Sequence, residues 1–175
     1  MILDERKTRH DHLINAAKQI MTAARTAPKG KGMDILEIIT VEGEDLKTLS
    51  DKTCDLGEQM NLKFMFRDAG NVLSAEAVVL IGTQSGLHGL NCSHCGFSSC
   101  ENKPETVPCT LNSVDVGIAL GSACATASDL RLDTRVMFSV GLAAQKLGWL
   151  KDCKTVFAIL VSASSKNPFF DRKTD

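Results

Sequence analysis

The sequence predicts an α/β (α+β) protein in which helices flank a sheet. Segments rich in β-branched residues alternate with segments of helical periodicity along the chain. The chain has 175 residues, of which 43% are hydrophobic, and this size is sufficient to bury a core. No internal repeat and no linker-like stretch divides it. We therefore expect one domain, residues 1–175.

The first elements follow from their periodicity. Residues 5–27 place apolar side chains at helical spacing, and Pro28 ends this helix because it cannot donate a backbone hydrogen bond. The β-branched segment 35–41 predicts a strand. Leucines at helical spacing then predict a helix over 44–59.

The later elements are predicted by apolar runs and capping residues. A short helix is expected over 66–76. Asn112 and Asp133 are candidate caps of two further helices, because their side chains accept bonds from free helix amides. These helices would cover 112–128 and 133–147, and the uninterrupted apolar segments 77–82 and 155–161 predict buried strands.

Composition excludes several classes of function. The chain has 20 Lys and Arg against 21 Asp and Glu, a net charge of −1, so we expect no nucleic-acid partner. No apolar run approaches the ~18 residues of a membrane span, and the N-terminus lacks the apolar stretch of a secretory signal. We expect a cytoplasmic protein without a membrane partner.

The cysteines carry the strongest chemical signal. Seven are present, and four lie within an expected loop at about 83–111: Cys92, Cys95, Cys100 and Cys109. In a reducing cytoplasm such a cluster favours metal binding over disulfides. Thiolates at this spacing can wrap one iron–sulfur cluster. Structural zinc, bound by the four thiolates or by three of them and His94, is the alternative.

The cysteine segment resembles a known iron–sulfur motif. Residues 91–100 are similar to the Asn-Cys-x-x-Cys-Gly-aromatic-x-x-Cys motif of the four-iron domain in corrinoid iron–sulfur proteins. This resemblance implies a [4Fe–4S] cluster, whereas spacing alone leaves [2Fe–2S] open. We expect His88 and His94 to be solvated loop histidines, with His94 a candidate hydrogen-bond donor to the cluster ligands.

A second candidate site is the glycine–lysine loop that follows the first helix. Its amides and cations could hold a phosphate or the edge of a flavin, although a helix end followed by a solvated turn explains the same residues. The segment resembles the Ala-Ala-x-x-Ala-Pro-Ser-Gly stretch of the FMN-dependent nitroreductase family. That resemblance implies a nitroreductase-like sheet and a homodimer with FMN at its interface. The FMN or anion ligands it implies are Arg25, Lys29, Gly30, Lys31, Lys166 and Arg172.

Along nearly its whole length the chain is similar to a family of uncharacterised prokaryotic proteins with a ferredoxin domain. The segments that carry this similarity are 27–32, 89–109, 115–122 and 166–172.

We predict an iron–sulfur redox protein that transfers electrons between an unknown partner and a flavin or small-molecule acceptor. The alternative is a non-enzymatic binding or sensor module held in shape by its metal. The sequence shows no Ser–His–Asp arrangement and no phosphate-binding Walker loop, so hydrolysis and phosphoryl transfer are not expected. Whether the protein is an oxidoreductase enzyme is left open.

Overall fold

The computed structural model describes residues 1–170, and its centre is a four-stranded antiparallel sheet of order β1-β2-β4-β3. In this sheet Leu36 pairs with Thr83, and Gln84 pairs with Cys153. The start of β1, the end of β2 and the start of β4 therefore share one end of the sheet. The strands are β1 Leu36–Glu42, β2 Ala77–Gln84, β3 Asp133–Met137 and β4 Cys153–Ser162.

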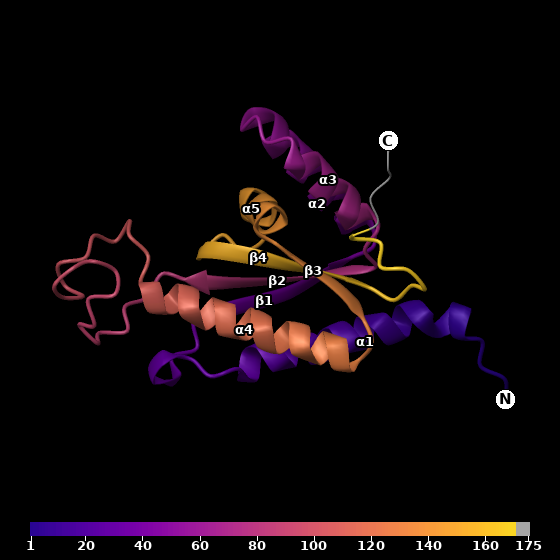
Figure 1. Ribbon diagram of the computed structural model, residues 1–175, viewed down its shortest axis with the longest axis horizontal. Helices are drawn as coiled ribbons and strands as arrows, with labels where there is room; N and C mark the ends of the chain where they lie inside the picture. The colour runs from indigo at the N-terminus through magenta and orange to yellow at the C-terminus, as the bar shows by residue number, and fades with distance from the viewer. Residues whose placement is uncertain (171–175) are drawn as a thin grey trace.

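Helices cover both faces of the sheet, so the structure has three layers (Figure 1). Helices α1 and α4 lie side by side on one face, and α2, α3 and α5 cover the other. None of the helices in residues 1–170 is long and apolar enough to cross a membrane. The helices are α1 Glu5–Thr26, α2 Glu44–Gln59, α3 Phe64–Leu73, α4 Thr110–Asp129 and α5 Phe138–Lys146, with a 3-10 turn at Gly30–Gly32.

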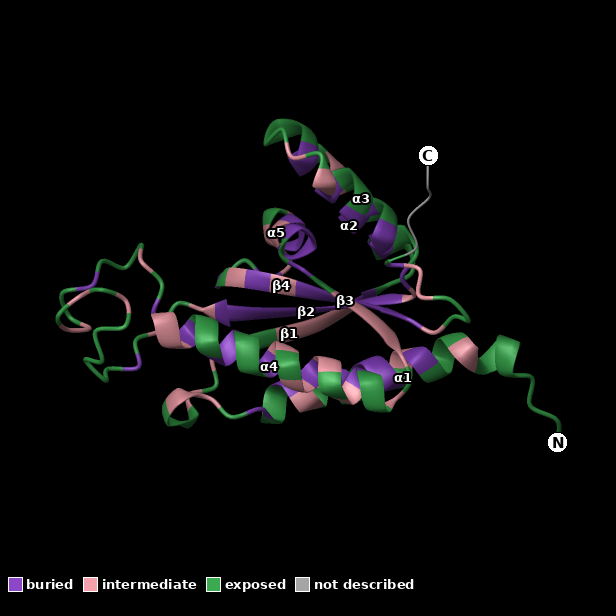
Figure 2. Ribbon diagram, viewed as in Figure 1, coloured by how far each residue is buried: buried purple, intermediate pink, exposed green. Residues whose placement is uncertain are grey.

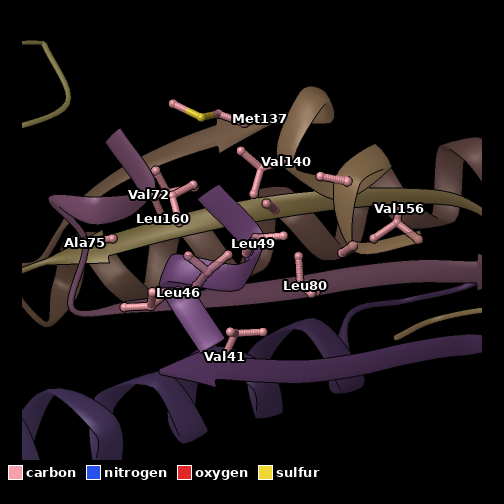
Figure 3. Close-up of a cluster of buried hydrophobic side chains, with 14 of the residues drawn as sticks. Val41, Leu46, Leu49, Val72, Ala75, Leu80, Met137, Val140, Val156 and Leu160 are labelled. Carbon is pink, nitrogen blue, oxygen red and sulfur yellow. The ribbon is translucent and has the colours of Figure 1, made fainter. Parts of the chain in front are cut away.

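Two hydrophobic cores lie on opposite faces of the sheet. Because side chains alternate along a strand, β2 supplies Leu80 to one core and Ile81 to the other. Strand β2 is buried on both faces, which explains its uninterrupted apolar sequence (Figure 2). The core beneath α2, α3 and α5 packs leucine and valine side chains against β2 and β4 (Figure 3).

The expected fold class is confirmed, with two local corrections. The predicted helix over 133–147 is wrong in its first part, because Asp133–Met137 is edge strand β3, paired with β4. This short strand has too few residues to show a period of its own. The other correction is that α4 begins at Thr110 rather than at a cap on Asn112, whose buried side chain instead donates to the carbonyl of Gly86 (3.0 Å).

Candidate metal centre

The four predicted metal ligands lie on the connection between β2 and α4. Between residues 85 and 109 this connection has no helix or strand, and it projects beyond the end of the sheet (Figure 1). Cys92 is exposed and Cys95 and Cys100 are partly buried, whereas Cys109 is buried directly before α4. None of the chain's seven cysteines forms a disulfide.

Hydrogen bonds close part of this loop into turns. The amide of Cys100 donates to Oδ1 of Asn91 (2.8 Å), and the amide of Asn91 lies 3.4 Å from Sγ of Cys100 as a donor to sulfur. The amide of Gly96 donates to the carbonyl of Ser93 (2.9 Å), with Gly96 at a φ of 85°, which glycine adopts without strain. These turns bring the first and third cysteine segments together.

Lys103 is buried in the second half of the loop. Its ammonium donates to the carbonyls of Pro104 (3.1 Å) and Val107, and its own amide donates to the carbonyl of Cys100 (3.4 Å). Hydrogen bonds of Lys103 therefore stabilise the segment between the third and fourth cysteines.

The chemistry of this donor set fits a thiolate-bound metal. Four free thiols share one loop that has little apolar core of its own, and one backbone amide within it, that of Asn91, already donates toward sulfur. Within residues 1–170, however, no group of three or more His, Cys, Asp or Glu side chains is gathered as metal ligands. For the four sulfur atoms to bind one centre, the loop would have to close further.

A buried histidine and aspartate join the base of this loop to the glycine–lysine loop. Oδ1 of Asp115 accepts the amide of Gly30 (2.9 Å), and its Oδ2 lies 3.3 Å from Nε2 of His88. The ammonium of Lys31 donates to the carbonyl of His88 (2.9 Å). A Cβ on Gly30 would lie 3.0 Å from Cε1 of the His88 ring, so glycine permits the close approach.

This pair was missed by sequence reasoning. His88 is 2% exposed, so the expectation of a solvated histidine is wrong. A signal was present in α4, whose 20 residues carry charge only at Asp115 and Asp129. A carboxylate on the buried face of such a helix requires polar partners, and these come from two other loops.

The cations of the glycine–lysine loop bind groups of their own chain. Lys29 donates to the carbonyls of Ala24, Arg25 and Ala27, which satisfies the end of α1. Arg25 donates to Oδ1 of Asp34 (2.7 Å). Burial alone would raise the pKa of Asp34, but its hydrogen bond to Arg25 and the charge of Arg25 lower that pKa below its ordinary value.

The C-terminal residues predicted for the same site lie elsewhere in the chain. Lys166 follows the far end of β4, at the opposite end of the sheet from Gly30, and Arg172 lies outside the described residues. Phe169 anchors this tail in the core beneath α2 and α3. One chain therefore does not bring Lys166 to the glycine–lysine loop.

The other three cysteines are buried or partly buried: Cys153 is buried, and Cys54 and Cys124 are partly buried. Burial raises the pKa of Cys153 to about 11 and also raises the pKa of Cys124. Burial together with nearby carboxylates raises the pKa of Cys54. These thiols are therefore poor metal ligands and poor nucleophiles near neutral pH.

A cavity of about 340 Å³ lies between the cysteine loop and the sheet. Two lysines, one glutamate and the backbone after β2 form its wall. The lining residues are Ser85, Gly86, Leu87, Lys103, Glu105 and Lys154.

Comparison with known proteins identifies the family. Residues 105–172 match the family described as "Uncharacterized protein containing a ferredoxin domain (DUF2148)". An uncharacterized protein of Archaeoglobus fulgidus is 38% identical over 182 residues, which cover 98% of each chain. The chain belongs to this ferredoxin-domain family. The family match begins inside the cysteine loop and includes Cys109.

Solved structures show that this ferredoxin-domain protein has a nitroreductase-like fold. A nitroreductase with bound FMN from Bacteroides fragilis matches with a TM-score of 0.60 at 12% identity, covering 92% of this chain and 82% of that one. The NADPH:FMN oxidoreductase of Vibrio harveyi has a TM-score of 0.58 at 14% identity over 91% of this chain. NfrA1 of B. megaterium has a TM-score of 0.56 at 15% identity over 93%. The chain spans 63% and 62% of the lengths of these last two proteins.

Proposed function

We propose that this protein is an iron–sulfur electron carrier whose [4Fe–4S] cluster is held by Cys92, Cys95, Cys100 and Cys109. The observation that carries the proposal is the set of four free thiols on one irregular loop. Membership of a ferredoxin-domain family and a fold shared with redox enzymes support it. Because thiol ligands must stay reduced, we also propose that the protein works in the cytoplasm.

Both side chains and backbone of the loop would contact such a centre. The four thiolates would bind the metal, and the amide of Asn91 would keep a hydrogen bond to the sulfur of Cys100. When bound, a cluster supplies reversible one-electron chemistry at a potential that depends on hydrogen bonds and exposure. Exposed Cys92 would bring one edge of the centre to the surface, where a redox partner can approach.

Anaerobic purification followed by iron, sulfide, zinc and flavin analysis tests the proposal. We expect iron and acid-labile sulfide in equal amounts, with visible absorption that bleaches on reduction by dithionite. Cys95→Ser abolishes this absorption, while Cys54→Ser, a thiol change in α2 far from the loop, preserves it. Protein that lacks iron after anaerobic purification contradicts the proposal.

Structural zinc is the second candidate, because four thiols also suit a closed tetrahedral zinc site. In that case the protein is a binding or sensor module whose loop is held in shape by the metal. Colourless protein that contains zinc and remains folded in dithionite supports this alternative over the electron carrier.

The outer face of α4 supports a proposed homodimer. Exposed positions on this helix carry no charge along most of its length, and a Cβ built on Gly117 or Gly121 meets no atom within 4 Å. A helix that is apolar on all sides is normally buried, so we propose that a second copy covers this face. The exposed apolar residues are Val114, Gly117, Ile118, Gly121 and Ala125.

A matched pair of charge substitutions tests the dimer. Ile118→Lys places a cation on the outer face of α4 and converts the protein to a monomer in light scattering. Leu73→Lys, the same kind of change on exposed α3 in the opposite layer, leaves the mass unchanged. Equal masses for both variants contradict this interface.

FMN binding in such a dimer is proposed for Arg25, Lys29, Gly30, Lys31, Lys166 and Arg172. Because Gly30 and Lys166 lie at opposite ends of the sheet, a site that used both groups would draw on two chains. Titration of the protein with FMN, followed by flavin fluorescence, tests this: quenching is expected, and its absence removes the flavin from the proposal.

A further inference from the structure

Lys103 is the buried cation of this protein. Among residues 1–170 no other lysine or arginine is buried, and Lys103 is 8% exposed. Long cationic side chains normally keep their charged end in water. The burial of this ammonium in an irregular loop therefore requires an explanation.

The partners of Lys103 do not neutralise its charge. In residues 1–170 its ammonium binds the carbonyl oxygens of Pro104 and Val107 and forms no ion pair with a carboxylate. Glu105 lines the same cavity without reaching it. These two carbonyl oxygens accept hydrogen bonds from the ammonium, but as neutral groups they do not neutralise its positive charge.

The loop that contains Lys103 also contains groups that can become negatively charged. Lys103 lies between Cys100 and Cys109 in the chain, and its amide is bonded to the carbonyl of Cys100. Four thiolates carry more negative charge than one divalent metal or one cluster core removes, so a four-thiolate centre is anionic overall. Metal binding would therefore add an anionic group to the same loop that buries this ammonium.

We propose that Lys103 is the counter-cation of the four-cysteine centre, a positioning residue that strengthens metal binding through its charge. This inference rests on the proposed metal site but not on the identity of the metal. It predicts that the charge, and not the hydrogen bonds to Pro104 and Val107, determines affinity.

Two substitutions separate the charge from the hydrogen bonds. Lys103→Gln keeps N–H donors that can reach the loop carbonyls but removes the charge, whereas Lys103→Arg keeps both. Lys154→Gln is the matched control, since Lys154 lines the same cavity but is exposed on β4. Zinc affinity of the anaerobic full-length protein is measured by competition with a chelator, and unfolding of metal-free protein is followed by circular dichroism.

We expect Lys103→Gln to bind zinc about tenfold more weakly than the unmodified protein, which corresponds to about 1.4 kcal/mol. Lys103→Arg and Lys154→Gln stay within about twofold. Metal-free Lys103→Gln is at least as stable as the unmodified protein, because without metal the buried charge has no counter-charge and stabilises nothing.

The inference is overturned if Lys103→Gln binds zinc as tightly as the unmodified protein, or if Lys103→Arg is as weak as Lys103→Gln. A loss of stability in metal-free Lys103→Gln with unchanged affinity also overturns it, since Lys103 is then a brace of the loop. Failure of the unmodified protein to bind zinc or iron is a different result, which removes the proposed function and this inference together.

Discussion

Asp115→Ala separates the cysteine loop from the glycine–lysine loop. The substitution removes the acceptor of the Gly30 amide (2.9 Å) and the group 3.3 Å from Nε2 of buried His88. A hydrogen bond to a charged partner is worth about 1.5–3 kcal/mol, and Ala regains about 0.5 kcal/mol of helix propensity. We therefore expect the free energy of unfolding to fall by about 2 kcal/mol and the melting temperature to fall by about 4–8 °C.

Urea unfolding and hydrogen exchange together measure this change. The Gly30 amide should exchange faster in Asp115→Ala, because its partner is gone, while amides of β2 remain protected. Asp115→Asn retains an oxygen acceptor and should lose less stability. Asp129→Ala, on the exposed end of the same helix, should change it by less than about 0.5 kcal/mol. If Asp115→Ala is as stable as Asp129→Ala, with unaltered exchange at Gly30, the two loops are not joined by this carboxylate.

Three further predictions follow from packing and ionisation. Gly141→Ala would place a Cβ 2.1 Å from a carbonyl oxygen of β4. Chemical denaturation should therefore show that the free energy of unfolding falls by about 3 kcal/mol or more, and an unchanged free energy would refute this packing. Iodoacetamide at about pH 8 should alkylate exposed Cys92 first and Cys153 only on unfolding, since burial raises the pKa of Cys153 to about 11. Mass spectrometry identifies the modified residues, and modified Cys153 among the early products would contradict this prediction. Asp34→Asn removes the carboxylate that pairs with Arg25, whose charge lowers the pKa of Asp34. Because this surface pair stabilises only when the carboxylate is ionised, the cost of about 0.5 kcal/mol should be present at neutral pH and lost as the pH falls through the lowered pKa of Asp34. A cost that persisted in acid would assign the effect to something other than this pair.

Most of the fold was predictable because its elements have clear periodicity. Apolar spacing located α1 and α2, and the uninterrupted apolar run 77–82 predicted a buried strand, as β2 is. Strand β3 was not predictable in this way. Burial does not alternate along its five residues, of which only Met137 is buried. The segment becomes a strand by pairing with β4, a long-range contact that local sequence does not display.

The candidate site was likewise predictable only in part. Residue type and spacing identify the four cysteines as candidate ligands, so their common loop could be predicted. The contacts that hold the loop could not, because His88, Asp115 and Gly30 are far apart in the chain and meet only once α4 packs beside α1. Likewise, nothing in the sequence distinguishes Lys103 from an exposed lysine, whereas its burial in the folded loop does.

X-ray absorption at the edge of the bound metal, on anaerobically purified protein, tests the central claim most directly. If Cys92, Cys95, Cys100 and Cys109 share one centre, the atoms bonded directly to each metal atom are all sulfur, at about 2.3 Å for zinc. Serine at any one of these four positions should replace a sulfur neighbour by oxygen or release the metal. A spectrum dominated by nitrogen or oxygen neighbours, or one that the serine variants leave unchanged, would contradict it.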